Sequence, residues 1–439
     1  MLLLRAFDAS SKPLLARRSN GVLSSPQIRS VCASNLLSLL TRLLFSIDYV
    51  RLSTTVATNA LLERKGRKHA LVITKGFKDL LLIGNQSRPK IFDLNIRRPL
   101  PLYSTVLEVD ERVTLVGYTS DPEAEKSAVL FDDDGKIVRS YGGEALAAPY
   151  DGSQPEIVRG LSGEAVSILK KPDLKTVEEN LKALYEGGYT SIAVILAHSY
   201  TYPHHELAIG NVARKIGFSQ VSLSSQLLPM IKMIPRGVSS TADAYLTPIL
   251  KEYLDGFFKG FDEKLKGSGK KGVGHSERRA RVEFMGSDGG LLDLDNFSGL
   301  KSILSGPAGG VVGYALTSWD ESEKIHIIGY FTYSFLIAVA DRPIRLDVGG
   351  TSTDVSRFAG RYEITYETTT AGISVQSPQM NINTVAAGGG SCLTFQNGLF
   401  KAGPESAGAE PGPACYRYVV LSTSAPAAES VPERAGHLR

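Results

Sequence analysis

The octapeptide Asp347-Val-Gly-Gly-Thr-Ser-Thr-Asp354 is the stretch of this sequence that decides the fold. Apolar residues lead into it, which predicts a strand that ends at the Gly349-Gly350 pair. Thr353–Phe358 and Tyr362–Glu367 carry the pattern of two further strands. We therefore expect three consecutive antiparallel strands over residues 345–367, with the glycine turn facing a cleft between two domains.

The same octapeptide has the composition of an anion-binding turn. A glycine pair between two strands lets backbone N–H groups point at one anion without a Cβ in the way. Hydroxyls of Thr351, Ser352 and Thr353 add donors for phosphate oxygens, and a carboxylate beside them can hold Mg²⁺. The alternative is an ordinary glycine-rich hairpin. A P-loop is excluded, because no Gly-Lys-Ser/Thr follows the glycines.

Charge and composition limit the classes of function. The 439 residues carry a net charge of +4, but residues 1–47 hold six basic residues and one acid. That head therefore contributes +5, which leaves −1 for the rest, so we expect no nucleic-acid partner. No apolar run reaches the ~18–20 residues of a membrane-spanning helix, so we expect no membrane partner. Three widely separated cysteines, Cys32, Cys392 and Cys415, exclude a disulfide framework and fit a reducing compartment.

The two ends of the chain differ from its middle. Residues 1–47 are rich in Ser, Leu and Arg, like an organelle transit peptide, or are an artefact of the chosen gene start. Residues 418–439 are rich in Ala, Ser and Pro without periodicity, which predicts a disordered tail. We expect both ends to pack little against the body.

Strands and helices alternate through the middle, which predicts an α/β fold. The predicted strands are His69–Thr74, Val106–Val113 at a sheet edge, and Ile192–Ala197. The predicted helices are Phe77–Ile83, Thr176–Glu186, and Ser239–Leu265 with a kink at Pro248.

Two further groups of residues suggest chemistry but have plainer interpretations. His198, His204, His205 and Glu206 follow a predicted buried strand and suggest a metal site, although capping or cleft histidines are commoner. Cys392 lies beside three glycines and is either a nucleophilic thiol or a buried small residue. For both groups the sequence favours the structural role.

The octapeptide resembles the second phosphate loop of the actin, Hsp70 and sugar-kinase ATPase fold, which is ribonuclease H-like and has two domains. Ser305–Gly313 resembles the small-residue helix that connects the domains of that fold, and Ala386–Cys392 supplies another glycine turn that could approach the adenosine or line the cleft. The connecting and cleft glycines implied by this resemblance are Gly306, Gly309, Gly310, Gly388, Gly389 and Gly390.

A more specific resemblance covers residues 48–417. Several blocks are similar to the hydantoinase A/5-oxoprolinase family, closest in wording to its eukaryotic ATP-hydrolysing 5-oxoprolinases. The blocks are Ser53-Thr-Thr-Val-Ala-Thr-Asn-Ala-Leu-Leu-Glu-Arg-Lys-Gly66, Phe92-Asp-Leu-Asn-Ile-Arg-Arg-Pro99, Glu108-Val-Asp-Glu-Arg112, His198-Ser-Tyr200, Ala242-Asp-Ala-Tyr-Leu-Thr-Pro248 and Gly403-Pro-Glu-Ser-Ala-Gly408. The resemblance implies an N-terminal domain over 48–225 and an ATPase domain over 226–417.

The family resemblance implies an activity and its residues. It implies ATP- and Mg²⁺-dependent hydrolysis of 5-oxo-L-proline, a cyclic amide, to L-glutamate, as in glutathione metabolism of the cytosol. Asp347 is then the catalytic and Mg²⁺-holding carboxylate. The implied phosphate-binding residues are Gly349, Gly350, Thr351, Ser352, Thr353 and Asp354, and the substrate-side candidates are Thr58, Asn59 and Arg88.

Other functions remain open at this point. A hydantoinase-type cyclic amide hydrolase or a ketone-carboxylating relative shares these motifs, whereas a sugar or glycerol kinase lacks the blocks at 53–66 and 403–408. A truncated and inactive family member is the third alternative. The resemblance also implies a partner, either a second copy in a homodimer or a hydantoinase B-type half.

The sequence departs from the family pattern in three places. No Asp-x-Gly-Gly-Thr-type first phosphate loop precedes the block at 53–66. Tyr330–Leu346 is an apolar insertion between Ile327-Ile-Gly329 and Asp347, which we expect to distort or bulge from the sheet edge. Family members also continue well past Tyr416. We expect this chain to cover part of one half-enzyme and, alone, to show no 5-oxoproline-dependent ATP hydrolysis.

Overall fold

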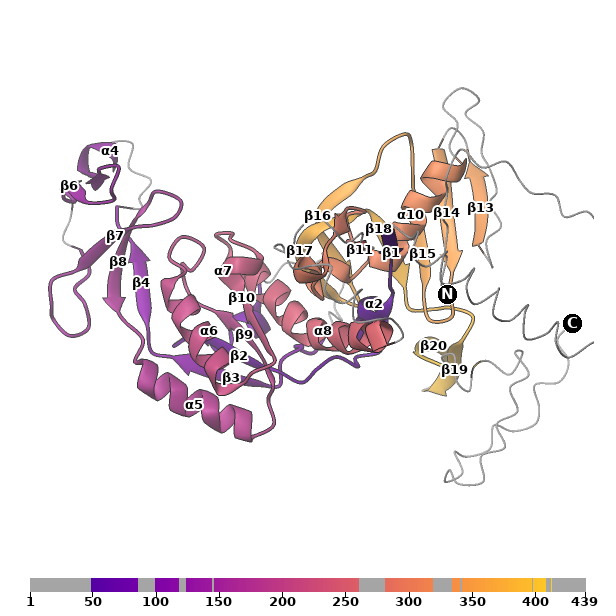
Figure 1. Ribbon diagram of the computed structural model, residues 1–439, viewed down its shortest axis with the longest axis horizontal. Coiled ribbons are helices and arrows are strands. Elements are labelled where there is room, and N and C mark those ends of the chain that lie inside the picture. Colours follow the sequence, from indigo (N-terminus) through magenta and orange to yellow (C-terminus); the bar gives the residue numbers. More distant parts are fainter. Residues whose placement is uncertain are drawn as a thin grey trace, which may run out of the picture.

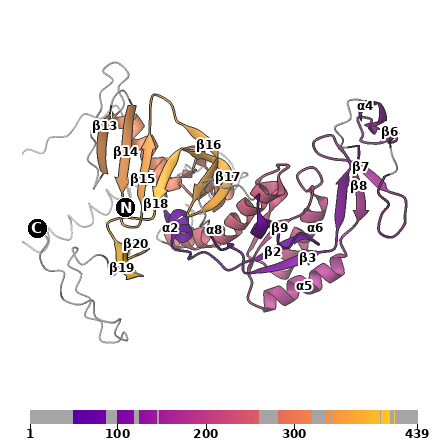
Figure 2. The ribbon, with the colours of Figure 1, turned by 180° about the vertical axis from the view of Figure 1, so that it is seen from behind.

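The computed structural model describes residues 49–85, 99–117, 124–143, 146–259, 281–318, 334–339, 342–396, 398–407 and 412. These residues form an elongated mixed α/β protein, which confirms the predicted α/β class (Figure 1). Two parts, each with its own sheets, lie on either side of the long helix α8 (Met233–Lys259), and the view from behind shows the same arrangement (Figure 2). The expected head and tail, at 1–47 and 418–439, lie outside the described residues.

The first part is built on a four-stranded parallel sheet. Its strands, in spatial order, are β10 (Gln220–Leu223), β9 (Ser191–Ile195), β2 (Ala70–Thr74) and β3 (Thr105–Val109). Every residue of β2 and β9 is buried, as the continuous apolar runs predict for strands that are covered on both faces. The predicted strands at 69–74 and 192–197 are therefore confirmed.

Helices cover both faces of this sheet. On one face α5 (Leu174–Glu186) and α6 (His204–Ile216) pack on Val72 and Val194. On the other face α8 contributes Ala244, which packs with Leu71 and Ile195. Helix α5 begins at Asp173, whose side chain accepts a hydrogen bond from Lys175 N, and ends at Gly187, so this predicted helix is confirmed.

The single strand predicted over 106–113 is wrong. The chain leaves the sheet at Asp110-Glu111 and β4 (Arg112–Leu115) joins a different, antiparallel sheet, although β3 does lie at a sheet edge as expected. The helix predicted over 77–83 shortens to α3 (Leu80–Ile83). The remaining elements of the first part are α4 (Ala124–Ser127), β5 (Leu130–Phe131), β6 (Ile137–Arg139), β7 (Glu156–Arg159), β8 (Ala165–Lys170) and α7 (Ser224–Leu227).

Over the described residues, the second part combines short sheets with two helices and two 3₁₀ turns. Strand β1 (Tyr49–Leu52) runs parallel to β11 (Arg281–Met285), and an antiparallel sheet has the order β13-β14-β15-β18. The helical elements are α2 (Val56–Leu62), η1 (Leu294–Asn296), η2 (Leu300–Ser302) and α10 (Ser305–Ser318). The other strands are β12 (Leu291–Leu292), β13 (Ser334–Val339), β14 (Arg342–Val348), β15 (Thr353–Arg357), β16 (Ile364–Thr370), β17 (Ile373–Met380), β18 (Ile382–Val385), β19 (Ser391–Gln396) and β20 (Leu399–Ser406).

The prediction of three consecutive antiparallel strands over 345–367 is right for the first pair and wrong for the third strand. Strand β15 pairs with β14 on one side and with β18 on the other, while β16 pairs with β17. The reason is the tight turn at Ala371-Gly372, where φ is 52° and 77°. Such a two-residue turn joins Thr370 directly to Ile373 and takes β16 into its own hairpin.

The bulge expected from the insertion is also wrong where the structure describes it. Strand β13 pairs with β14 residue for residue, from Ser334 opposite Asp347 to Val339 opposite Arg342. It lies at the edge of the sheet, as the sequence suggested. Residues 330–333, 340 and 341 of the insertion lie outside the described residues. An apolar, β-branched segment followed closely by a second strand is sufficient to form a regular edge hairpin.

Helix α8 connects the two parts through its packing. Its Ala242, Tyr245 and Leu246 pack with residues of β17 and α10, on the opposite side from the first sheet. Ser239 Oγ accepts a hydrogen bond from Gln376 N at 2.9 Å, and Ala244 O accepts one from Ser191 Oγ at 2.7 Å. Pro248 lies inside the helix, as predicted, and the predicted end at 265 lies outside the described residues.

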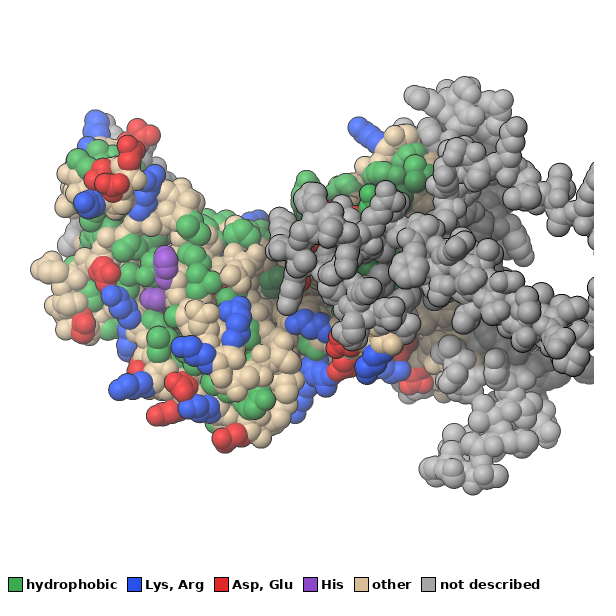
Figure 3. Space-filling model, in the orientation of Figure 1, with side chains coloured by type: hydrophobic (Ala, Val, Ile, Leu, Met, Phe, Trp, Pro, Cys, Tyr) green, Lys and Arg blue, Asp and Glu red, His purple; other side chains and the backbone are tan. Residues whose placement is uncertain are grey.

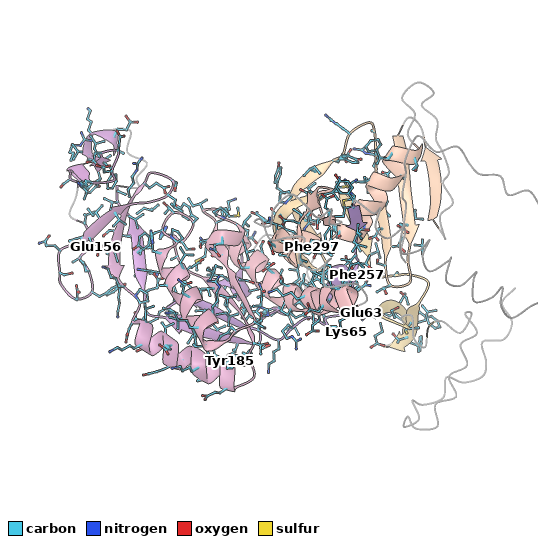
Figure 4. The ribbon with its side chains drawn as sticks, in the orientation of Figure 1. Glu63, Lys65, Glu156, Tyr185, Phe257 and Phe297 are labelled. Carbon is cyan, nitrogen blue, oxygen red and sulfur yellow. The ribbon has the colours of Figure 1, made fainter. Side chains whose placement is uncertain are left out.

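Three of the side chains labelled in Figure 4 help to locate the elements: Glu156 lies in the outlying sheet, Tyr185 lies on α5, and Phe297 lies where the two parts meet. Phe297 stacks on Phe284 with ring centroids 4.7 Å apart. Over the described part of the face in Figure 3, basic and acidic side chains are interspersed. Among the described residues, no helix is long and apolar enough to cross a membrane.

Candidate functional site

A cavity of about 480 Å³ lies beside the octapeptide. It is lined by the β14–β15 turn, by the segment that leads into α2, by the start of α10 and by one residue of α8. The lining residues are Ser53, Thr54, Thr55, Val56, Asn59, Tyr253, Gly306, Pro307, Asp347, Gly349, Gly350, Thr351, Ser352 and Asp354. The glycine turn therefore faces a cavity, as the sequence predicted. The walls of this cavity come from the second part and from α8, so it is not a cleft between the two parts.

The turn is held by its carbonyl groups and presents its amide groups. Gly349 N–H donates to Ser352 O at 2.8 Å, which closes the turn. The carbonyls of Gly349 and Gly350 accept hydrogen bonds from Gly389 N and Gly390 N, at 2.9 and 2.7 Å. Within the described chain, the N–H groups of Gly350 and Thr351 find no acceptor. Consecutive unpaired amides on exposed glycine-rich backbone form an anion-binding concavity.

The second glycine turn braces the first one rather than lining the cavity. A Cβ on Gly388 would lie 2.6 Å from Gly349 O, so only glycine lets these two turns approach so closely. Gly388, Gly389 and Gly390 are not among the cavity-lining residues. Their role in the structure is to position Gly349 and Gly350.

Two carboxylates lie at the base of the turn. Asp347 and Asp354 face each other across the β14–β15 pair, and both line the cavity. Thr384 Oγ1 donates to Asp354 Oδ1 at 2.7 Å, and Thr353 Oγ1 donates to Ala387 O, so Thr353 supports the turn. Like charges directly opposite each other on a sheet repel, and a divalent cation between them relieves that repulsion. Carboxylate and hydroxyl oxygens are the ligands that Mg²⁺ prefers, so this donor set fits the ion.

Helix α10 contains Gly306, Gly309 and Gly310, which the resemblance assigned to a helix that connects two domains. A Cβ on Gly306 would lie 2.4 Å from Thr55 Cγ2, and one on Gly309 would lie 2.9 Å from Ser53 Cβ. The two glycines therefore let α10 lie directly against residues 53–55, and Gly306 N donates to Thr54 O at 2.9 Å. Gly310 follows on the same helix and is half-buried.

The three substrate-side candidates have different positions. Asn59 lines the cavity. Thr58 is fully buried and its hydroxyl donates to Ile303 O, so it holds α2 in place and does not face the cavity. Arg88 lies outside the described residues.

Sequence reasoning missed six residues of the cavity: Ser53, Thr54, Thr55, Val56, Tyr253 and Pro307. Ser53, Thr54 and Thr55 belong to a block that matched the family, but only its later residues were singled out. Helical periodicity predicts Tyr253 on the apolar face of α8, but 39% of its surface is exposed. The run of three hydroxyl residues before a helix was the available signal for this wall of the cavity.

The histidine cluster forms a structural network at the carboxyl ends of the parallel strands. His205 Nδ1 lies 2.8 Å from Glu111 Oε2, and Thr74 Oγ1 donates to the other oxygen of Glu111. Buried Glu206 accepts hydrogen bonds from Leu196 N, Ser224 Oγ and Ser225 N at 2.6–2.8 Å. We call Thr74, Glu111, His205, Glu206 and Arg236 the strand-end network. No group of three or more metal-binding side chains occurs in the part of the chain that the structure describes.

Buried Arg236 completes the strand-end network. Its guanidinium donates to Ser199 Oγ and Leu196 O, both at 2.7 Å. Burial lowers the pKa of neighbouring His198, and the charges of Arg236 and Arg112 lower it further. His198 therefore favours its neutral form, which fits the structural role that the sequence favoured. Cys392 is half-buried in β19.

Comparison with known proteins identifies the family. A model of the hydantoinase/oxoprolinase N-terminal region matches residues 26–217, and the hydantoinase/oxoprolinase model matches residues 236–425. An uncharacterised protein of Schizosaccharomyces pombe is 56% identical over 372 residues, which are 84% of this chain and 25% of that protein. The 5-oxoprolinase of Saccharomyces cerevisiae is 50% identical over 373 residues, which are 85% of this chain and 25% of that enzyme.

A solved structure shares the fold. Acetone carboxylase in its nucleotide-free form superposes with a TM-score of 0.55 at 20% identity, over 82% of this chain and 42% of that one. The chain spans about a quarter of the length of the curated relatives it matches. Two consecutive family models and relatives of about 50% identity together lead to one conclusion: this chain belongs to the hydantoinase/oxoprolinase family.

Proposed function

We propose that this chain is the nucleotide-binding portion of an enzyme that hydrolyses 5-oxo-L-proline to L-glutamate with ATP. The observation that carries the proposal is the cavity in which the unpaired amides of Gly350 and Thr351 lie beside the carboxylates of Asp347 and Asp354. Relatives of 45–50% identity that carry the name 5-oxoprolinase support the substrate.

The overall reaction requires coupling. A five-membered lactam is a stable amide, and ATP cleavage supplies the driving force to open it. One ATP, one lactam and two waters give ADP, inorganic phosphate and glutamate. The amide C–N bond breaks, a water oxygen joins the carbonyl carbon, and the nitrogen becomes the amine. The protein's task is to position the γ-phosphate and to stabilise the charge that develops on it.

Each residue of the turn has a role in this proposal. Gly349, Gly350, Thr351 and Ser352 form the phosphate cradle, with the amides and the Thr351 hydroxyl as donors. Asp347 holds Mg²⁺, and Asp354 and Thr353 keep the turn in place. When bound, Mg²⁺ supplies positive charge to the phosphate oxygens. No basic side chain of the described residues lines the cavity, so backbone donors and the metal carry the recognition of the phosphate.

The proposal extends to the architecture and the partner. In an actin-like ATPase fold, the glycine turn that lines the cavity corresponds to the second phosphate loop. We propose that a hydantoinase B-type half, or a second copy of the chain, completes the enzyme. The cysteine usage supports a reducing compartment such as the cytosol.

Binding of nucleotide to the purified chain tests the proposal. Titration with a non-hydrolysable ATP analogue should show affinity that depends on Mg²⁺. Asp347→Asn should lower that affinity at least about tenfold, because a charge-assisted contact contributes about 1.5–3 kcal/mol. The matched control is Asp133→Asn, on an exposed turn far from the cavity, which should not change it. Equal Mg²⁺-dependent affinity for wild type and Asp347→Asn would refute the assignment.

Turnover provides the second test. The purified chain alone should release no glutamate and phosphate above background. With a family-type first phosphate loop restored and a hydantoinase B-type half supplied, the two products should appear in equal amounts. Asp347→Ala should abolish them. Preference for hydantoin over 5-oxoproline in this assay would favour the hydantoinase alternative instead.

A further inference from the structure

One wall of the cavity has polar side chains with no structural use. Ser53, Thr55 and Asn59 all line the cavity. Among the residues that the structure describes, their side chains form no hydrogen bond, whereas nearby Thr54 and Thr58 bond to Val56 N and Ile303 O. The hydroxyl and carboxamide groups on this wall are therefore available to a ligand.

The backbone behind these side chains is held rigidly. Thr54 N donates to Ser305 Oγ at 3.2 Å, Gly306 N donates to Thr54 O, and Asn59 N donates to Thr55 O at 2.9 Å. The contact of Gly306 with Thr55 leaves no space for the segment to shift towards α10. The backbone that carries Asn59 is therefore already fixed, and a ligand has to order only the Asn59 side chain on binding.

The carboxamide of Asn59 has the right chemistry for one kind of amide. Its Oδ1 accepts and its Nδ2 donates, side by side in one plane. In a five-membered lactam the ring forces the amide to be cis, so N–H and C=O point to the same side. Asn59 can pair with both groups at once, which a trans amide does not allow.

We propose that Asn59 is the residue that recognises the cyclic amide, by two parallel hydrogen bonds to its cis N–H and C=O groups. The proposal rests on the proposed function, because it places the lactam in the same cavity as the phosphate-binding turn. The carbonyl oxygen of an amide has two lone pairs, and Asn59 uses the one on the N–H side. The other lone pair remains free to face the γ-phosphate.

The hydroxyl groups of Ser53 and Thr55 give this subsite its second feature. They lie on the same segment as Asn59 and are donors for the carboxylate that 5-oxoproline carries beside its ring nitrogen. No basic residue of the described chain lines the cavity. The amide group of the ligand should therefore contribute more to the binding affinity than its carboxylate. Simple five-membered lactams should therefore compete with 5-oxoproline.

Three ligands test the proposal without any mutation. Saturation-transfer NMR titrations of the chain, with and without Mg²⁺ and the ATP analogue, compare 5-oxoproline, N-methyl-5-oxoproline and the trans amide N-acetylglycine. Loss of one hydrogen bond should weaken the second and third ligands about tenfold relative to the first. Equal binding of the three ligands, or no saturable binding of 5-oxoproline, would overturn the proposal.

Variants then assign the effect to Asn59. Asn59→Leu and the isosteric Asn59→Asp should each lower 5-oxoproline affinity about tenfold or more and remove the preference over the N-methyl ligand. Asn211→Leu, at an exposed asparagine of α6, is the matched control and should behave as wild type. If both Asn59 variants still prefer 5-oxoproline over the N-methyl ligand, another residue recognises the amide.

A parallel nucleotide titration separates the two proposals. Asn59→Leu should bind the Mg²⁺–nucleotide complex as the wild type does, because Asn59 lies outside the phosphate-binding turn. If the wild-type chain binds no nucleotide but discriminates lactams through Asn59, the proposed ATP site fails and the lactam subsite stands. If nucleotide binding depends on Asp347 but the chain does not discriminate between the lactams, the proposed ATP site stands and the lactam subsite fails.

Discussion

The strand-end network of the first part and the cavity of the second part use similar side chains in opposite ways. In the network, both oxygens of Glu111 and of Glu206 receive hydrogen bonds from the protein. In the cavity, the amide N–H groups of Gly350 and Thr351 and the side chain of Asn59 have no hydrogen-bond partner among the described residues. Saturated polar groups stabilise a fold, whereas polar groups that line a cavity without partners are available for a ligand.

This difference corrects an intuition about titratable clusters. The sequence His204-His205-Glu206 suggests a catalytic or metal site more strongly than Ser-Thr-Thr or Gly-Gly does. In the structure, however, His205 and Glu206 form hydrogen bonds that support the fold. A buried carboxylate needs hydrogen-bond donors from the protein, so its oxygens are already occupied and are not available to a ligand. Functional groups are better recognised by the bonds they lack than by their residue type.

The largest expected effect comes from breaking the strand-end network. Glu206→Ala removes the acceptor for Leu196 N, Ser224 Oγ and Ser225 N and leaves these buried donors unsatisfied. Removing one partner from such a buried charged network costs about 3–5 kcal/mol of unfolding free energy, measured by urea denaturation. Glu178→Ala, at an exposed helical pair with Lys182, should leave stability unchanged. If Glu206→Ala instead lowers nucleotide affinity at full stability, the contrast between the two regions is wrong.

The next effect is a pH dependence that belongs to the first part. Burial lowers the pKa of His69 to about 4. In the unfolded chain this pKa is near 6.5, so below that pH the unfolded state takes up a proton that the folded state does not. Stability is therefore full above pH 6.5 and falls as pH approaches 4, by at most about 3 kcal/mol.

Unfolding free energies between pH 7 and pH 4 measure this effect. His69→Phe keeps a ring beside Tyr245, whose centroid lies 6.1 Å from that of His69, and should flatten the profile. His204→Phe changes an exposed histidine and should leave the profile as it is. A slope that persists unchanged in His69→Phe would assign the pH dependence to another group.

The smallest expected effect on stability comes from a substitution in the wall of the cavity. Gly306→Ala places a methyl group 2.4 Å from Thr55 Cγ2, so α10 and residues 53–55 must separate. Overpacking of this kind costs about 1–3 kcal/mol, and the shifted wall should weaken lactam binding as well. Gly313→Ala, on the same helix with nothing within 4 Å, should instead gain about 0.5–1 kcal/mol. Thermal unfolding and lactam titration of both variants measure the difference. Equal behaviour of the two would show that close approach at Gly306 is unimportant.

Local pattern was sufficient for much of the fold. Apolar runs between breakers predicted β2 and β9, and 3.6-residue periodicity predicted α5 and α8. The strand predicted over 106–113 failed because its interruption depends on Glu111, whose partners Thr74 and His205 are distant in sequence. The predicted partner of β16 was wrong because the two-residue turn at Ala371-Gly372 pairs β16 with β17.

The candidate site was predicted in part for a similar reason. The octapeptide is a contiguous motif, so its seven candidate residues were found together, and six of them line one cavity. Thr58 and Asn59 are neighbours in sequence, but consecutive residues of a helix point about 100° apart, and only Asn59 reaches the cavity. Helix α2 has seven residues, too few for periodicity to show which face is buried. The packing against α10 decides it.

The shared helix α8 also limits how such a protein can be divided during evolution. A break in the gene at codon 225 would separate β2 and β9 from Ala244 and its neighbours, and the sheet would lose the cover on one face. The same break would separate Ser191 from Ala244, whose carbonyl oxygen accepts a hydrogen bond from the Ser191 hydroxyl. Splicing or shuffling events that fall there should yield insoluble fragments, so the two parts are expected to be inherited as one piece, whatever their separate origins.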